Sequence, residues 1–277
     1  IRLAEEIVDA VPCADKVRFF STGSEATLYA MRLARAFKSK DKILKFEGGF
    51  HGMNDYALMS MAPKKLYKFP QSEPDSPGIP KAVQSEVLIA PFNNIEMTSL
   101  IIEEHHDEIA GVIVEPLQRF IPPAPGFLQG LRNVTQHFEI PLIFDEIVTG
   151  FRLSYGGAQE YYHVTPDLCT LGKALGGGFP LTAVAGKTEF MEYFDSNSVD
   201  SYNYLPQVGT LSGNPVACAA GLATLSVLRQ ENPYKNLFQK GKMLMQGLQN
   251  TFDDAQIPVR VVGEPVLFDV MLLFLLE

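Results

Sequence analysis

Apolar residues along the chain follow two kinds of pattern, short continuous runs and longer amphipathic stretches. The short runs hold four or five residues, are rich in Ile, Val or Leu, and lie at 42–46, 87–90, 111–114 and 141–144. Such runs, bounded by Gly, Pro or Asp, are typical of strands buried on both faces of a sheet. The amphipathic stretches predict helices at 23–38, 95–104, 126–138, 215–229 and 234–252. This alternation predicts an α/β fold with a mostly parallel sheet and helices on both of its faces.

The same patterns continue to both ends of the chain. Residues 1–8 have the pattern of an amphipathic helix, and residues 261–276 form an apolar, strand-like run. We therefore expect the protein to extend beyond both ends of this sequence. Residues 63–80 are rich in proline and make the longest predicted loop, which is a candidate lid or interface segment.

Composition narrows the class of protein. The chain has 277 residues, of which 46% are hydrophobic and 20% charged, as expected for a globular protein with a sizeable core. Its 23 basic and 32 acidic side chains give a net charge of −9, which argues against a nucleic-acid binder. No apolar run approaches the roughly 18 residues of a membrane span, so no membrane segment is predicted.

Cysteines and clustered polar residues predict no metal centre. Cys13, Cys169 and Cys218 are far apart and form no paired motif. A disulfide framework or a structural zinc site is therefore not expected, and a reducing, cytoplasmic setting fits best. The polar segment 103–108 contains adjacent histidines, which do not share a helix face, so we interpret it as a helix end.

Four polar segments lie where a predicted strand ends or a helix begins. They are Ser21–Ser24, Glu115–Pro116, Phe144–Glu146 and Leu171–Lys173. Because ligands of open parallel sheets bind beyond the carboxyl ends of the strands, these segments are the candidates for a binding site.

Each candidate has a functional and an ordinary interpretation. The helix start at residues 22–24 is suited to a phosphate group, although a simple N-cap is the preferred explanation of this segment taken alone, and no P-loop motif is present. Asp145 ends an apolar run and would need a cationic partner if buried, for example a protonated heteroaromatic nitrogen; otherwise it caps the following turn.

Lys173 lies among apolar residues and glycines. Burial would lower its pKa and favour Schiff-base formation, whereas a surface lysine before a flexible turn is the alternative.

Taken in order, seven segments resemble the class III family of pyridoxal-phosphate-dependent aminotransferases, and within it the glutamate-1-semialdehyde aminomutase-like branch. The segments are 21–26, 46–52, 114–116, 144–152, 155–161, 171–180 and 209–215. The resemblance runs from residue 1 to about residue 270. It implies a fold-type-I large domain that binds the cofactor over residues 1–255, followed by the start of a C-terminal small domain at 256–277.

The resemblance also implies roles for individual residues. Lys173 would carry the cofactor as an internal aldimine and move the proton during catalysis, and Asp145 would pair with the pyridine nitrogen. Thr210 would reach the phosphate in the neighbouring subunit, which implies a homodimer. The cofactor-binding set implied in this way is Gly23, Ser24, Phe50, His51, Glu115, Asp145, Ile147, Lys173 and Thr210. In it, Gly23 and Ser24 would hold the phosphate, and Phe50 and Ile147 would cover the two faces of the ring.

Two positions depart from the family pattern. Phe50 stands where the family often has Tyr, and Phe120 stands where related branches carry Asn or Glu. The second change borders the implied site and indicates a less polar substrate. We therefore expect amino-group transfer between an amino compound and a keto acid or aldehyde. An aminomutase or racemase on the same scaffold is the first alternative, and a non-catalytic, truncated domain that dimerises is the second.

Overall fold

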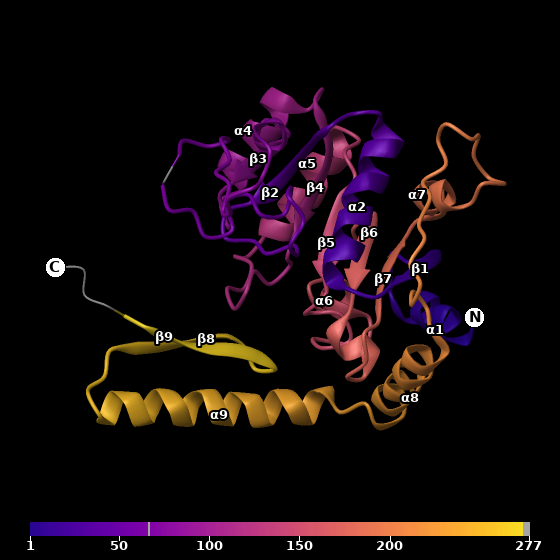
Figure 1. The fold of residues 1–277 in the computed structure, drawn as a ribbon. Helices are drawn as coiled ribbons and strands as arrows, with labels where there is room; N and C mark the ends of the chain where they lie inside the picture. Colours follow the sequence, from indigo (N-terminus) through magenta and orange to yellow (C-terminus); the bar gives the residue numbers. More distant parts are fainter. Residues whose placement is uncertain (66, 274–277) are drawn as a thin grey trace.

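The computed structural model describes residues 1–65 and 67–273. A seven-stranded sheet with the order β1-β7-β6-β5-β4-β2-β3 forms the centre, and β8 and β9 form a separate two-stranded sheet (Figure 1). The strands are β1 (Lys16–Phe20), β2 (Lys42–Phe46), β3 (Val87–Ala90), β4 (Ile109–Val114), β5 (Leu142–Glu146), β6 (Leu168–Leu171), β7 (Thr182–Gly186), β8 (Val259–Glu264) and β9 (Leu267–Leu272). The helices are α1 (Arg2–Ala10), α2 (Gly23–Lys38), α3 (Lys81–Gln84), α4 (Ile95–His105), α5 (Phe127–His137), α6 (Gly157–Tyr161), α7 (Thr188–Met191), α8 (Pro215–Glu231) and α9 (Tyr234–Asp254), with 3₁₀ turns η1 (Lys173–Gly176) and η2 (Glu192–Phe194).

The central sheet confirms the predicted α/β class. Strands β3, β2, β4, β5 and β6 are parallel neighbours, whereas β7 pairs antiparallel with both β6 and β1. All four predicted strands are present. Strand β4 begins two residues earlier than expected, at Ile109, and β5 continues through Asp145 to Glu146. The carboxyl end of β5 therefore carries a candidate site residue directly.

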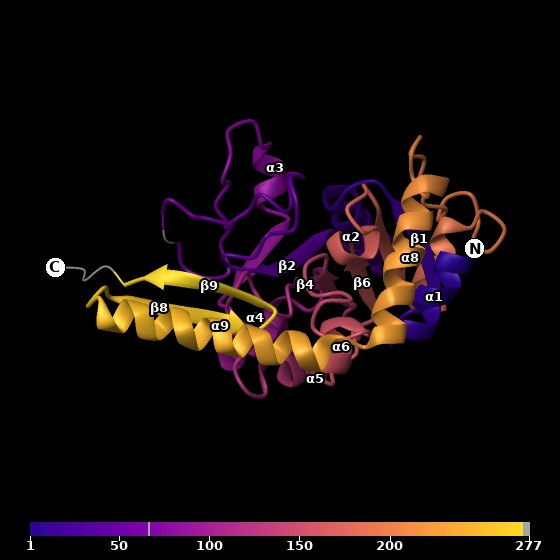
Figure 2. The same ribbon diagram turned by 90° about the horizontal axis from the view of Figure 1, so that it is seen from below.

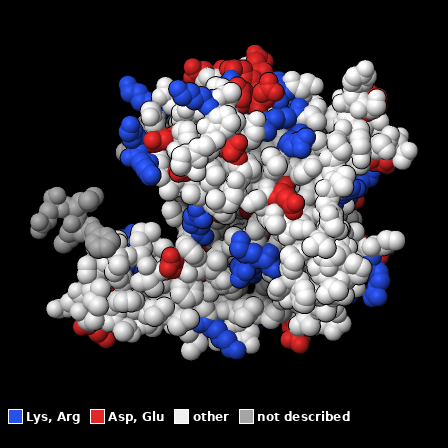
Figure 3. Space-filling model, in the orientation of Figure 1, with Lys and Arg blue, Asp and Glu red and all other residues white. Residues whose placement is uncertain are grey.

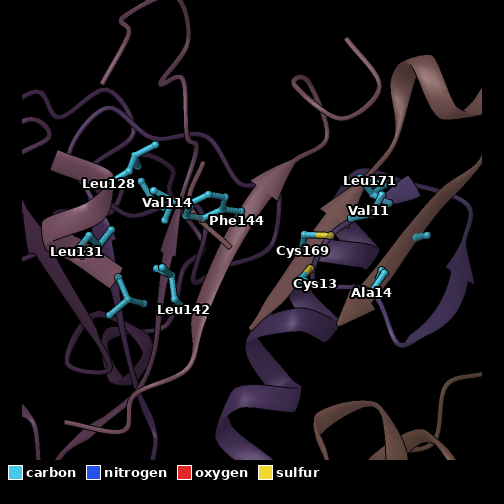
Figure 4. Packing of buried hydrophobic residues seen from close by; sticks show 14 of the residues in the cluster. Val11, Cys13, Ala14, Val114, Leu128, Leu131, Leu142, Phe144, Cys169 and Leu171 are labelled. Carbon is cyan, nitrogen blue, oxygen red and sulfur yellow. The ribbon is translucent and has the colours of Figure 1, made fainter. Parts of the chain in front are cut away.

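Helices cover both faces of the sheet, as the alternation of elements predicted. Helix α2 packs on one face, where Ile143 of β5 belongs to the same apolar cluster as Met31 and Leu33. The neighbouring residues Leu142 and Phe144 point to the other face, as the two-residue period of a strand requires. On that face they join Leu128 and Leu131 of α5 in a second cluster, part of which Figure 4 shows. The remaining labelled side chains of that cluster in Figure 4 are Val11, Cys13, Ala14, Val114, Cys169 and Leu171.

The first turn of α2 is fixed by a reciprocal cap. Thr22 accepts a hydrogen bond from the backbone N–H of Glu25, and the Glu25 carboxylate accepts one from the backbone N–H of Thr22. This capping box stabilises a helix start and explains why the helix begins at Gly23, as predicted. It also fixes the position of Gly23 and Ser24 at the end of the sheet where the parallel strands finish.

The C-terminal part forms its own layer. Helix α9 and the β8–β9 hairpin lie side by side at one end of the molecule, away from most of the central sheet (Figures 1 and 2). The boundary at residue 255 stays a prediction, and residues 274–277 of the predicted small domain lie outside the described residues. None of the helices in the described part of the chain combines the length and apolar character needed to cross a bilayer.

The proline-rich segment 63–80 has neither helix nor strand in its described residues. An isolated bridge pairs Met59 with Pro74, and α3 begins directly after the segment. Its role as a lid or interface stays a prediction.

Candidate active site

One cavity brings together all four candidate segments. It has a volume of about 550 Å³ and lies where the parallel strands end and α2 begins. Its lining includes Ser21, Thr22, Gly23, Ser24, Phe50, Glu115, Arg119, Phe120, Asp145, Ile147 and Lys173. The cavity is therefore surrounded by an amine, carboxyl groups, a helix start and apolar side chains. Figure 3 shows Lys and Arg side chains around the hollow between the central sheet and α9, while Asp and Glu gather mainly at the far end of that face.

Asp145 is held by three hydrogen-bond contacts at the end of β5. Its Oδ1 accepts from Thr170 Oγ1 at 2.8 Å and from the backbone N–H of Ile147 at 3.2 Å, and its Oδ2 lies 2.8 Å from His51 Nδ1. Thr170 is placed by the register of the sheet, because it pairs with Asp145 across β5 and β6. The residue is only 5% exposed, so the carboxylate has a fixed orientation in the cavity wall.

His51 lies behind Asp145 and does not line the cavity. Its side chain is 1% exposed, and burial lowers its pKa, which favours the neutral imidazole. Since a carboxylate only accepts hydrogen bonds, Nδ1 carries the proton and donates it to Asp145. The backbone oxygen of His51 accepts from Thr27 Oγ1 at 2.5 Å. The structure thus places His51 as the partner that orients Asp145.

The start of α2 approaches the loop 47–53 very closely. Gly52 has φ +90°, and a Cβ atom built on it would lie 2.7 Å from Ser24 Cα and Oγ. The Ser24 hydroxyl accepts from the backbone N–H of Met53 at 3.0 Å, so its own O–H is still able to donate. The N–H groups and the positive dipole end at the start of this 16-residue helix, together with that hydroxyl, have the chemistry that suits an anion.

Lys173 begins the 3₁₀ turn η1 two residues after the last residue of β6, with φ +41°. Of the two interpretations left open for Lys173, full burial does not hold, because the residue is exposed and lines two cavities. The second cavity, of about 650 Å³, is lined by residues of η1, α9 and the β8–β9 turn. Partial burial nevertheless lowers the pKa of the Lys173 amine, while the Asp145 carboxylate raises it and Arg152 lowers it.

Glu115 and Arg119 hold Phe50 at the cavity. The Glu115 carboxyl group accepts from the backbone N–H of Phe50 at 2.8 Å, and the Arg119 guanidinium lies 4.8 Å from the centre of the Phe50 ring. Burial and the nearby charge of Asp145 raise the pKa of Glu115 to about 7. Phe50, which stands in place of the usual Tyr, is therefore held at its backbone by Glu115 and at the face of its ring by Arg119.

Of the remaining residues considered in the sequence analysis, two line the cavity and one does not. Ile147 and Phe120 both line the cavity, whereas Thr210 does not and is exposed in the segment before α8. Its contact with a neighbouring subunit stays a prediction.

Three residues around the site were missed by the sequence analysis. Thr170 donates a hydrogen bond to Asp145, and Arg119 lies over the ring of Phe50. Lys45 binds the loop that carries Phe50. A signal existed only for Lys45, a charged side chain inside the apolar run 42–46.

The fold and the site define the class: this is the α/β fold of the fold-type-I pyridoxal-phosphate-dependent transferases. Residues 1–270 match the family Aminotransferase class-III, and the chain belongs to that family. It is 44% identical over 273 residues to the glutamate-1-semialdehyde 2,1-aminomutase of Methanococcus maripaludis. That similarity covers 98% of this chain and 62% of the relative, so the chain spans less than two thirds of the relative's length.

Solved structures give the same family relationship. An omega-transaminase from Sphaerobacter thermophilus matches with a TM-score of 0.91 and 38% identity, over 98% of this chain and 62% of that protein. A beta-phenylalanine aminotransferase from Variovorax paradoxus matches with a TM-score of 0.82 and 30% identity, over 97% of this chain and 58% of that protein.

Proposed function

We propose that this chain carries the cofactor site of a pyridoxal-phosphate-dependent enzyme that moves an amino group between an amino compound and a keto acid or aldehyde. The observation that carries the proposal is the convergence of Lys173, Asp145 and the start of α2 on one cavity. Membership of the class-III aminotransferase family supports it.

The residues of the cavity fit each part of this cofactor. The start of α2 with Gly23 and Ser24 suits a phosphate dianion, and the buried Asp145 carboxylate suits a protonated pyridine nitrogen. Phe50 and Ile147 supply apolar surfaces for an aromatic ring, and the Lys173 amine suits an aldehyde carbon. When bound, pyridoxal phosphate supplies the electron sink for the carbon that bears the amino group.

The chain's own residues would perform three tasks. Lys173 would bind the cofactor and then move a proton at its Nζ atom, for which a lowered pKa is favourable because more of the amine is unprotonated. Asp145 would present a carboxyl group of fixed orientation to the ring nitrogen, because Thr170 and His51 hold its two oxygens. Glu115 would keep the backbone of Phe50 in place.

A related reaction on the same site is the second candidate. Relatives at about 44% identity are named glutamate-1-semialdehyde 2,1-aminomutase, and an aminomutase moves the amino group within one molecule without a separate acceptor. Racemisation is a further possibility on the same scaffold. The proposed assembly is a homodimer in the cytoplasm, with Thr210 reaching the neighbouring site. The apolar Phe120 in the cavity wall supports a substrate less polar than a dicarboxylate.

Acceptor stoichiometry tests the proposal. The protein, loaded with pyridoxal phosphate, is incubated with an amino donor and a keto acid, and both products are quantified. Transfer predicts one new amino acid for each donor consumed, with none formed by Lys173→Ala. Product formation without any consumption of the keto acid would contradict transfer and favour the aminomutase.

A further inference from the structure

Lys45 is a buried lysine on β2, the strand next to the edge strand β3 of the central sheet. It lies on β2, is 1% exposed, and has the buried apolar residues Leu44 and Phe46 on either side in the chain. Lysines normally occupy solvated surfaces, since a buried ammonium group requires compensating partners. A lysine at this position therefore calls for a specific explanation.

Its ammonium group has three partners, all of them backbone carbonyl oxygens. Nζ donates to Ala57 at 2.7 Å, to Met59 at 2.7 Å and to Gly49 at 3.0 Å. An ammonium group has three N–H donors and no acceptor, so these three carbonyls use its whole capacity. The contact binds both ends of one segment, residues 49–59, to a single point on β2.

This segment carries residues of the candidate site. Phe50 and Gly52 line the cavity, and His51 orients Asp145. The bond to Gly49 is made at the residue directly before Phe50. The three hydrogen bonds of Lys45 thus connect β2 to the segment that carries Phe50.

We propose that the Lys45 ammonium group is a positioning group that fixes the 49–59 segment, and with it Phe50 and His51, in the geometry that receives the cofactor. Lys45 lines no part of the cavity and acts through the segment. The statement about the cofactor rests on the proposed function, whereas the statement about the segment does not.

The two carboxyl groups nearest to Lys45 favour its ammonium form, as the carbonyls do, whereas a nearby guanidinium opposes it. Burial lowers the pKa of Lys45 to about 7, and the carboxyl groups of Asp75 and Glu115 oppose that shift, whereas Arg119 adds to it. The three carbonyl dipoles also favour the ammonium form, because a neutral amine would face one of them with its lone pair.

The chain offers a matched control on the same strand. Lys42 lies three residues before Lys45, and its ammonium group is partly exposed between Glu108 and Glu86. The change Lys42→Met therefore removes the same charge from the same strand without touching the 49–59 segment.

Amide hydrogen exchange of the cofactor-free protein at pH 6 tests the first half of the proposal. In Lys45→Met we expect the hydrogen-bonded amides of Phe50, Met53 and Ala57 to exchange at least about tenfold faster, since three carbonyls lose their donor. Amides of α5 and β5 should change much less, and Lys42→Met should leave the segment unchanged. A uniform increase over the whole chain in Lys45→Met would mean a purely structural role and would overturn the proposal.

Cofactor binding tests the second half. We expect Lys45→Met to bind pyridoxal phosphate about tenfold more weakly and with an altered visible circular dichroism band, because the ring of Phe50 is no longer fixed. Unchanged affinity and dichroism would overturn the proposal. Failure of the unmutated protein to bind the cofactor would refute the proposed function and leave the exchange result valid.

A measurement on the unmutated protein covers the case in which Lys45→Met does not fold. Proton–nitrogen correlation spectra at pH 6 should show one slowly exchanging lysine ammonium signal, which Lys42→Met retains. Complete absence of a protected ammonium signal would contradict the three-carbonyl site.

Discussion

Adding one methyl group at Gly52 should disturb the start of α2 through Ser24. A Cβ atom there would lie 2.7 Å from Ser24 Cα and Oγ and 3.0 Å from Ser24 Cβ. Carbon atoms in contact are normally about 3.5–4.0 Å apart, so either the helix start or the loop must move by almost an ångström. Gly52→Ala therefore tests whether the two segments that form the proposed phosphate site are in direct contact.

The size of the effect follows from two contributions. The φ of +90° at Gly52 is unfavourable for alanine by about 1–2 kcal/mol. Overpacking against backbone and side-chain atoms of Ser24 adds about 1–3 kcal/mol. Gly78 provides the control, because it has φ +93° and nothing within 4 Å of its built Cβ atom. Gly78→Ala therefore carries the first contribution without the second.

The assay compares the free energies of unfolding of both variants in urea and their affinities for pyridoxal phosphate. Gly52→Ala should be less stable than Gly78→Ala by about 1–3 kcal/mol. It should also bind the cofactor at least about tenfold more weakly, a loss that Gly78→Ala does not share. Equal stabilities within about 0.5 kcal/mol, together with equal affinities, would refute the close contact and its role in the phosphate site.

Three further substitutions follow from the same site. Asp145→Asn should lower turnover by several orders of magnitude, because a neutral amide cannot stabilise a pyridinium; steady-state kinetics showing near-normal kcat would contradict the pairing. Thr170→Val keeps the side-chain shape and removes one donor to Asp145, so we expect cofactor affinity and kcat to fall only about tenfold, and an unchanged affinity would argue against a role for that bond. Burial raises the pKa of Glu115 from 4.5 to about 7, so the folded state keeps a proton that the unfolded state has already lost. Stability from this group therefore falls as pH rises from about 4.5 to 7, by at most about 3 kcal/mol. In urea titrations, the free energy of unfolding of Glu115→Gln should fall less between pH 5 and pH 8 than that of the unmutated protein. An equal decrease in the two proteins would exclude Glu115 as its source.

Apolar periodicity was sufficient to predict the elements with strong patterns. Helix α2 spans Gly23–Lys38 as expected, and β2 and β3 have their predicted bounds. Strands with weaker patterns were not predicted. Strand β1 contains two basic residues among its five, and β7 consists largely of small residues, so neither forms an Ile- or Leu-rich run. Their place in the sheet is set by pairing with each other and with β6.

From the residues alone, the site was predictable only as far as it depends on strand ends. Asp145, Lys173 and the start of α2 were candidates because residues at such ends converge in an open parallel sheet, whereas Phe50 and Ile147 were implied only by the family resemblance. The contact of Thr170 with Asp145 depends on the register between β5 and β6, which periodicity does not determine. The place of His51 behind Asp145 depends on the path of the loop after β2, which periodicity does not determine and which is held in part by the contact of His51 with Asp145, 94 residues further along the chain.

The most direct test of the central claim is to locate the covalent attachment of the cofactor. The purified protein is mixed with pyridoxal phosphate, its visible absorption is recorded, and the sample is reduced with borohydride and analysed by peptide mass mapping. We expect a yellow protein in which, after reduction, one pyridoxyl group is attached to Lys173. A protein that stays colourless, or an adduct on a surface lysine with Lys173 unmodified, would contradict the assignment of this cavity as the cofactor site.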